Sequence, residues 1–144
     1  MKSLSYNFYS GWNGVNRHEN QRATMIAEEW GYVGFAADVY GVGFHDVVDV
    51  EERTKLGRTY RANPSLFMRR IQLAIEEVKG MDNVIKDKIG VIGYCFGGTG
   101  ALMYALLSDT NDVLGSVSVH GGMLKHSRKL KRLTYKLLPL WRIF

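Results

Sequence analysis

The 144-residue sequence predicts an α/β fold built on a doubly wound, mostly parallel sheet. Short, nearly continuous apolar runs have the composition of strands buried on both faces, and helical patterns lie between them. Strands that alternate with helices imply right-handed crossovers and therefore a parallel sheet. With 46% apolar and 23% charged residues, a chain of this length is predicted to bury a single core.

The first part of the chain predicts one helix and one buried strand. Residues 17–30 place apolar side chains at helical spacing between charged ones, and Gly31 ends this helix. The run 32–39 is apolar almost throughout, which is typical of a strand covered on both faces. Residues 6–9 offer at most a weak strand before the helix.

The second part repeats this alternation. Asn63 and Pro64 open a helix, because proline suits the first helical turn, and apolar residues follow on one side. Residues 88–94 form the next predicted strand and 98–107 a helix of small residues. Residues 113–119 give a third apolar strand.

Charge divides the chain unevenly. Residues 1–123 hold 12 basic and 14 acidic side chains, whereas residues 124–144 hold seven basic and none acidic. The formal charge of +5 therefore belongs to the last segment, which argues against a nucleic-acid-binding protein. We predict an α/β domain over 1–123 and a basic amphipathic tail over 124–144.

The lone cysteine excludes an internal disulfide framework, and the first residues lack the apolar run of a signal peptide. No stretch approaches the roughly 18 apolar residues of a membrane span. These features predict a cytoplasmic protein. No two histidines have a metal-ligand spacing, so we expect neither a metal site nor a cofactor.

A glycine-rich turn joins the strand 88–94 to the helix after it. It has the G-x-C-x-G-G form of a nucleophile elbow, with Cys95 at its centre. Such a nucleophile sits in a strained turn with positive φ, and glycines are needed where strand and helix close over it. The helix N-terminus then favours the thiolate, and the Phe96 N–H would be an oxyanion donor. The glycines of this turn are Gly93, Gly97 and Gly98.

Two other interpretations of this turn compete with a nucleophile elbow. Glycine-rich turns between strand and helix also bind phosphates, but the glycines here do not make G-x-G-x-x-G. A free cysteine is also among the most buried residue types and is often only structural. The strand–turn–helix context favours a nucleophile position for Cys95.

The run Val91-Ile92-Gly93-Tyr94-Cys95-Phe96-Gly97-Gly98 resembles the elbow of the dienelactone hydrolase family, a branch of the α/β-hydrolases with a cysteine nucleophile. Three further stretches resemble family segments in the right order. They are the loop at 12–16, the strand and loop from Gly31-Tyr32 to Asp38-Val39-Tyr40-Gly41, and the strand end His120-Gly121-Gly122. Together they cover about residues 11 to 123, so the predicted domain is a partial dienelactone-hydrolase-like unit.

This resemblance implies hydrolysis of a small-molecule carboxylic ester, lactone or thioester through an acyl-thiol intermediate. It makes Cys95 the nucleophile and the N–H groups of Phe96 and Trp12 the oxyanion donors. Asp38 is expected to anchor its loop rather than to take part in catalysis. The family's substrate-binding arginine has no secure counterpart, since Arg53, Arg58 and Arg61 all fit about equally.

The chain departs from the family where the rest of the catalytic triad is expected. The fold delivers nucleophile, acid and histidine in that order. After Cys95 the only acids are Asp109 and Asp112, predicted at the wrong edge of the sheet. His120 is the only histidine at a suitable strand end, and without an orienting acid it is a weak candidate base that would rather bond backbone.

We therefore expect a fold that is incomplete at the N-terminus and lacks the C-terminal third, with weak or no activity. One alternative is a non-catalytic interaction protein whose tail docks on an anionic membrane surface or a protein partner. The tail supports this with apolar residues near helical spacing between basic ones, although the favoured interpretation is that it is sequence unrelated to the family. A third alternative is an oligomer in which a second chain supplies the missing strands.

Overall fold

The computed structural model describes residues 3–9, 11–41, 43–44, 48–109 and 112–122, with the backbone alone for 3–9. The predicted tail at 124–144 lies outside these ranges, so its docking on a membrane or partner stays a prediction. Eight elements follow in the order β1 (Ser3–Tyr9), α1 (Arg17–Trp30), β2 (Val33–Ala37), α2 (Val50–Ala62), α3 (Pro64–Gly80), β3 (Val84–Tyr94), α4 (Phe96–Leu107) and β4 (Gly115–Val119).

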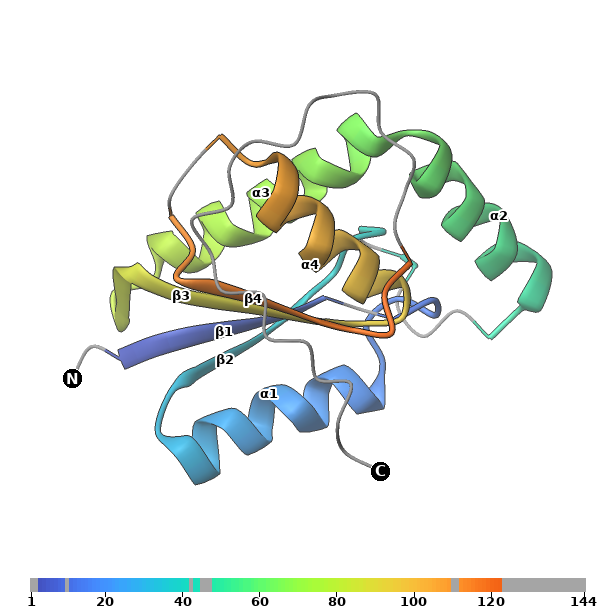
Figure 1. Cartoon of the computed structure of the whole chain (residues 1–144). Coiled ribbons are helices and arrows are strands. Elements are labelled where there is room, and N and C mark those ends of the chain that lie inside the picture. The colour runs from blue at the N-terminus through green and yellow to red at the C-terminus, as the bar shows by residue number, and fades with distance from the viewer. Residues whose placement is uncertain (1–2, 10, 42, 45–47, 110–111, 123–144) are drawn as a thin grey trace.

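The described strands form one parallel sheet in the order β2-β1-β3-β4. Helices α3 and α4 lie on one face with α2 beyond α3, and α1 covers the other face (Figure 1). Helices on both faces of a parallel sheet are the doubly wound α/β arrangement that the sequence predicts.

Most predicted elements are found close to their expected bounds. Helix α1 spans the predicted residues, β3 begins four residues before the predicted 88, and α4 begins two residues before the predicted 98. Helix α2 was not predicted from the sequence. Strand β1, expected to be weak at best, instead lies in the middle of the sheet, paired on both sides.

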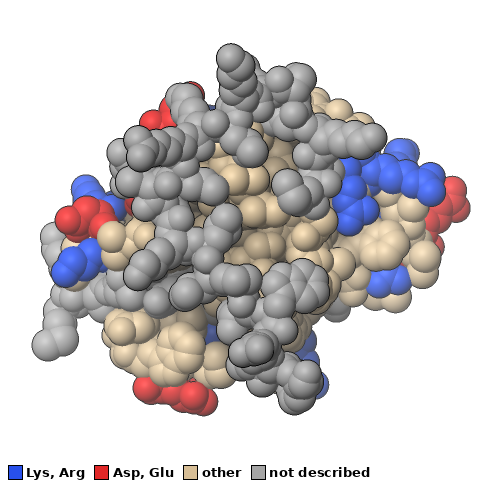
Figure 2. Space-filling model, in the orientation of Figure 1, with Lys and Arg blue, Asp and Glu red and all other residues tan. Residues whose placement is uncertain are grey.

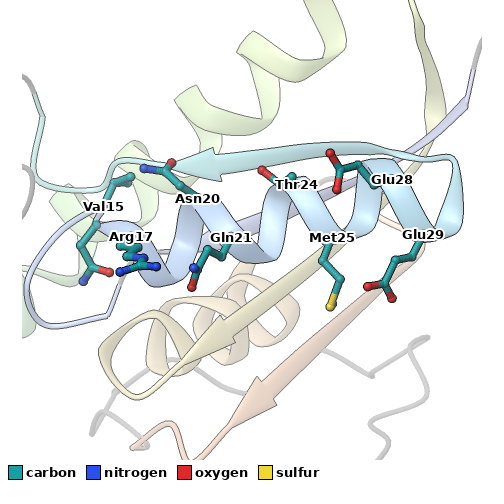
Figure 3. A pocket seen from close by; sticks show the side chains of 9 residues that line it. Val15, Arg17, Asn20, Gln21, Thr24, Met25, Glu28 and Glu29 are labelled. Atoms are coloured by element: carbon teal, nitrogen blue, oxygen red, sulfur yellow. The ribbon is translucent and has the colours of Figure 1, made fainter.

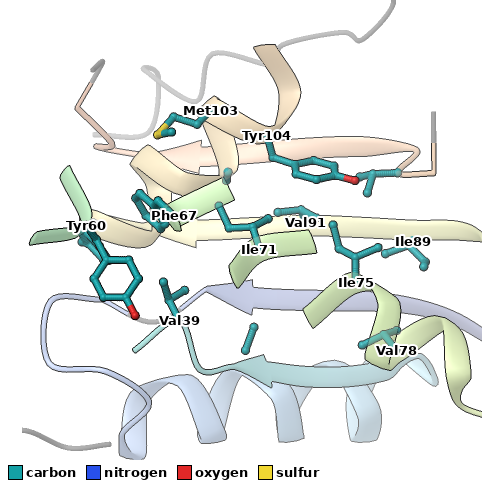
Figure 4. Packing of buried hydrophobic residues seen from close by; sticks show 14 of the residues in the cluster. Val39, Tyr60, Phe67, Ile71, Ile75, Val78, Ile89, Val91, Met103 and Tyr104 are labelled. Carbon is teal, nitrogen blue, oxygen red and sulfur yellow. The ribbon is translucent and has the colours of Figure 1, made fainter. Parts of the chain in front are cut away.

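The main core lies between the sheet and the two helices α3 and α4 (Figure 4). Apolar side chains one turn apart on α3 face the sheet, and each adds about 1.5–3 kcal/mol when fully buried. Glycine at position 100 lets α4 approach α3, because a Cβ there would lie 2.9 Å from Phe67 Cζ. Fully buried members of this core include Phe67, Ile71, Ile75, Val78, Ile89 and Val91.

Charged side chains of both signs share the visible surface. Figure 2 shows Lys and Arg side chains over α2, with acidic ones beside them. The sequence of α2 accounts for this mixture, since it carries four basic residues and Glu51 and Glu52. In the described part of the chain, no helix is long and apolar enough to cross a membrane.

Candidate active site

The predicted site residues leave the sheet at one edge, the carboxyl end of its parallel strands. In the strand register Tyr9 lies beside Ala37 on one side and Gly93 on the other, and Tyr94 lies beside Val119. The segments that follow these residues therefore meet at the same edge, which is where parallel α/β sheets bind ligands. They carry Trp12, Asp38, Tyr40, Cys95, Phe96 and His120.

Cys95 occupies a strained turn between β3 and α4. Its backbone has φ 52° and ψ −112°. Residues with a Cβ rarely adopt this conformation, which costs about 1–3 kcal/mol. Its N–H donates to the Val119 carbonyl at 3.0 Å, and its own carbonyl accepts from Thr99 N at 3.1 Å. The turn is thus fixed to β4 and to α4, and Cys95 is half-buried at the helix N-cap.

Glycines permit this turn because backbone meets backbone around it. A Cβ at Gly93 would lie 2.1 Å from the Gly97 carbonyl oxygen, and one at Gly98 would lie 2.9 Å from the Val119 carbonyl oxygen. The steric reason predicted for the elbow is therefore present at Gly93. Gly121, at the end of β4, is equally constrained, since its Cβ would lie 2.3 Å from the Gly98 carbonyl carbon.

The two predicted oxyanion donors lie in different local structures, a helix start and a short turn. Phe96 begins α4, so its N–H is among those that find no acceptor within the helix. These N–H groups carry the positive end of the helix dipole. Trp12 lies in a short turn that the Gly14 N–H closes by donating to the Gly11 carbonyl at 3.4 Å.

The carboxylate of Glu19 anchors the turn around Trp12 through two hydrogen bonds. This carboxylate is 3% exposed and lies in the first turn of α1. One of its oxygens accepts from Gly11 N and the other from Asn16 N, each at 3.1 Å. The second bond completes a capping box with Asn16, so the helix start and the turn share one anchor.

Trp12 is also anchored by helix α2 and by Tyr40, which is in turn held by Tyr60. The indole Nε1 donates to the Arg53 carbonyl at 2.7 Å. The Tyr40 hydroxyl donates to the Trp12 carbonyl at 3.2 Å, and the Tyr60 hydroxyl donates to the Tyr40 carbonyl at 3.3 Å. These contacts were not predicted from the sequence, because α2 was not predicted and Tyr40 was noted only as part of a resemblance.

An aromatic cluster lies beneath the elbow. The Phe96 ring stacks on Phe67 at a centroid distance of 4.6 Å, and the rings of Tyr40 and Tyr60 lie 5.4 and 6.4 Å from it. Above Phe96 lies the Arg61 guanidinium, 5.6 Å from the ring centroid. Of the three arginines considered for a substrate-binding role, Arg61 is thus the one found against the elbow helix.

Tyr40 keeps its proton in this setting. Burial raises the pKa of its hydroxyl well above the usual range, and Tyr60 and Cys95 add to the rise while Arg61 opposes it. Asp38 anchors the same loop, as expected, because its Oδ1 accepts from the N–H groups of Tyr40 and Gly41 at 3.0 and 3.1 Å.

The candidate base His120 follows β4 at the same edge, with φ 44° and an exposed side chain. Within the described part of the chain, no hydrogen bond joins its ring or the Cys95 thiol to another group. His18, in the first turn of α1, has its ring 5.5 Å from that of Tyr94 at the end of β3 and edge-on to it. No three His, Cys, Asp or Glu side chains among the described residues form a group that could hold a metal ion.

Asp112 lies away from this edge, as the sequence predicts. Its carboxylate accepts from Lys79 Nζ at 2.8 Å and from the Tyr104 hydroxyl at 2.6 Å. Leu114, two residues on, donates its N–H to the Ile89 carbonyl near the start of the paired part of β3. Asp112 therefore links α3 and α4 to the amino end of β4.

A groove of about 620 Å³ runs along α1 (Figure 3). Its lining comes from Val15 to Glu29 and includes Arg17, Met25 and Glu28. Since α1 covers the face of the sheet opposite α4, this groove is separate from the Cys95 turn.

One known protein family matches most of the chain. Residues 9–137 match the model of the dienelactone hydrolase family. The match ends inside the predicted tail, and the boundary at 123 stays a prediction. No curated protein matches the chain.

Two solved structures share this fold. A dienelactone hydrolase-like promiscuous phosphotriesterase from metagenomic libraries is 26% identical with a TM-score of 0.76, covering 85% of this chain and 49% of its own. A structure named m3DLH is 27% identical with a TM-score of 0.78, covering 85% of this chain and 50% of its own. The chain thus spans about half the length of the structures that it matches.

Proposed function

This chain belongs to the dienelactone hydrolase family, and we propose that it acts on carboxylic esters, lactones or thioesters with Cys95 as its nucleophile. The observation that carries the proposal is the conformation of Cys95. A half-buried thiol is held at positive φ on the N-cap of α4, between glycines whose backbones touch. A structural cysteine would gain nothing from this strain, whereas a nucleophile gains its exposure above the sheet edge.

The proposed chemistry is acyl transfer to sulfur. The Cys95 thiolate attacks the carbonyl carbon and forms a C–S bond, while the carbonyl electron pair moves onto oxygen. Donors from the backbone of Phe96 and Trp12 stabilise that oxyanion. When the tetrahedral intermediate collapses, the bond to the leaving group breaks, an alkoxide or phenolate leaves from an ester or lactone and a thiolate from a thioester, and an acyl-thiol remains on the enzyme.

The second half-reaction requires a base that activates water. His120 is the candidate at this edge, and in the described residues no hydrogen bond orients its ring. A histidine without an orienting partner is a poor general base. We therefore propose that this chain is acylated at Cys95 and then releases the acyl group slowly, so that its turnover is weak or absent.

A pre-steady-state experiment with p-nitrophenyl acetate tests the proposal. We expect a burst of p-nitrophenolate close to one equivalent per chain, followed by a slow steady phase, and a thioester at Cys95 detectable by mass spectrometry. Cys95→Ala should remove the burst. Because the chain has one cysteine, a thioester can form only at Cys95.

Two results would contradict the proposal in different ways. A burst that survives in Cys95→Ala would place acylation on another side chain and reject Cys95 as nucleophile. Sustained rapid turnover that depends on Cys95 would show that a base is present, and would reject only the expectation of weak activity.

A further inference from the structure

We infer that Tyr40 is a positioning residue for the oxyanion hole, because its one side chain is in contact with both of the residues that supply the donors. Its hydroxyl bonds the Trp12 carbonyl at 3.2 Å, and its ring lies 5.4 Å from the Phe96 ring. The inference rests on the proposed function, since Trp12 and Phe96 matter only if an oxyanion forms at Cys95.

The Trp12 N–H lies between two anchored atoms. On one side, the Gly11 N–H donates to buried Glu19 at 3.1 Å. On the other, the Trp12 carbonyl accepts from Tyr40. The Gly11 N–H and the Trp12 carbonyl are both held, so rotation of the backbone between them is restricted. The Trp12 N–H therefore keeps its orientation. Without the Tyr40 hydroxyl, the backbone anchors that remain are the bond from Gly11 to Glu19 and the long bond of 3.4 Å from the Gly14 N–H to the Gly11 carbonyl, both on the amino side of Trp12 Cα.

Tyr40 is itself held at three points. Its N–H donates to Asp38 Oδ1 at 3.0 Å, and its carbonyl accepts from the Tyr60 hydroxyl at 3.3 Å. Its ring is packed against Phe96 and Tyr60, and only 3% of the residue is exposed. A side chain fixed in this way holds the turn around Trp12 in a defined position relative to the core.

The hydroxyl is available as a donor under the conditions of the reaction. Burial holds its pKa well above the usual tyrosine range, so it stays protonated at any pH at which a cysteine thiolate is assayed. The Trp12 carbonyl has no proton to give, and the bond therefore keeps one direction.

The test compares two reactions of the same thiol in Tyr40→Phe. Acylation by p-nitrophenyl acetate forms an oxyanion, whereas alkylation by iodoacetamide displaces iodide from a tetrahedral carbon and forms none. We expect the acylation rate to fall about tenfold, which corresponds to about 1.4 kcal/mol and to the loss of one hydrogen bond. The alkylation rate should stay within about twofold of the wild-type value, because this reaction uses the same thiol and develops no oxyanion.

Matched tyrosine variants provide the controls. Tyr104→Phe removes a buried hydroxyl bond to Asp112, more than two turns along α4 from Cys95, and should change neither rate. Tyr60→Phe removes the bond to the Tyr40 carbonyl and should lower acylation by less than Tyr40→Phe. A fall in both acylation and alkylation in Tyr40→Phe would indicate a general disturbance of the elbow and overturn the inference.

A second measurement does not depend on acylation. Hydrogen exchange of the Trp12 and Asn13 amides, followed by NMR, should accelerate in Tyr40→Phe and not in Tyr104→Phe. Unchanged exchange would overturn the inference, as would unchanged acylation of Tyr40→Phe. A wild-type chain that is not acylated at all would instead reject the proposed function, and the exchange result would still decide whether Tyr40 fixes this turn.

Discussion

At the scale of single residues, the elbow is defined by contacts that exclude side chains. Gly93, Gly98 and Gly121 each place a hypothetical Cβ within 3.0 Å of backbone atoms. Backbone atoms cannot swing aside as the end of a flexible side chain can, so the two strands and α4 would have to move apart. The geometry of Cys95 thus depends on positions that carry no chemistry of their own.

Gly93→Ala should therefore lower the free energy of unfolding by about 3 kcal/mol, near the upper end for overpacking. Gly80→Ala is the control, because nothing lies within 4 Å of a Cβ there. Alanine in place of glycine at this helix end should leave stability unchanged or raise it by up to about 1 kcal/mol. Urea denaturation of both variants provides the measurement, and equal midpoints would contradict the steric argument.

The buried hydroxyl of Tyr40 predicts a pH dependence at the alkaline end. Its pKa is raised in the folded chain, so above a pH of about 10 the unfolded chain loses a proton that the folded chain keeps. Stability is then fully present below that pH and falls as pH rises. Wild type should lose up to about 1.4 kcal/mol per pH unit more than Tyr40→Phe in this range.

Denaturation curves collected at several pH values above neutrality measure this difference. The comparison of slopes, rather than of absolute stabilities, removes the constant effect of the missing hydrogen bond. Parallel curves for the two proteins would show that the Tyr40 hydroxyl titrates as in the unfolded chain.

At the scale of elements, the sequence predicts the helices and strands that are specified by local signals. It misses those whose position depends on contacts with residues far along the chain. Helix α1 was predicted to the residue from apolar side chains at helical spacing and from the stop at Gly31, which are local signals, whereas the equally local capping box of Asn16 and Glu19 was not used. The turn at Cys95 was recognisable for the same reason. Its glycines are adjacent in sequence, and their steric role is local.

Helix α2 shows why the other elements were missed. Its few apolar residues include Leu56 and Tyr60, and Gly57 at its centre is a poor helix former. The structure explains that glycine, because a Cβ there would lie 3.0 Å from the Trp12 indole nitrogen. The pairing between Trp12 and α2 spans about forty residues, so no window of sequence contains it.

Strand β1 was undervalued for a related reason. A central strand of a parallel sheet is expected to be apolar throughout, whereas Ser3–Tyr9 alternates polar and apolar residues. Alternation is typical of a strand with one exposed face. Its partners β2 and β3 determine its place in the sheet, and they lie later in the chain.

The anchor shared by α1 and the Trp12 turn gives a prediction at this scale. Glu19→Gln keeps one acceptor oxygen and replaces the other by an amide that cannot accept, so one of the two bonds is lost. Thermal or urea unfolding should show a loss of about 1–2 kcal/mol. Glu28→Gln, on the exposed side of the same helix, should change stability by less than about 0.5 kcal/mol.

At the scale of the whole molecule, the two ends of the parallel strands have separate tasks. The carboxyl end gathers Cys95, Phe96 and Trp12, and the amino end of β4 is fixed by Asp112 to Lys79 and Tyr104. The ion pair is partly buried, with side-chain exposures of 30% and 19%, so it is screened less than a surface pair. The proposed chemistry and this cross-link therefore lie at opposite ends of the sheet.

Asp112→Asn tests that separation. It weakens a bond to Lys79 and a short bond from Tyr104, and should lower the free energy of unfolding by about 1–2 kcal/mol. The rate of Cys95 acylation under folding conditions should equal that of wild type, since no contact of the elbow is altered. A parallel loss of acylation rate would show that the two ends are coupled through the sheet.

The strand order β2-β1-β3-β4 also has a consequence during synthesis. Strand β1 leaves the ribosome before the other described strands, and its neighbour β2 follows within about thirty residues. Its other neighbour is far away, because Asn7 lies beside Val91 in the sheet. At roughly 5–20 residues per second, one side of β1 waits roughly 4–16 s for its partner. A nascent chain with an open strand edge is a natural client for chaperones that bind early and release late.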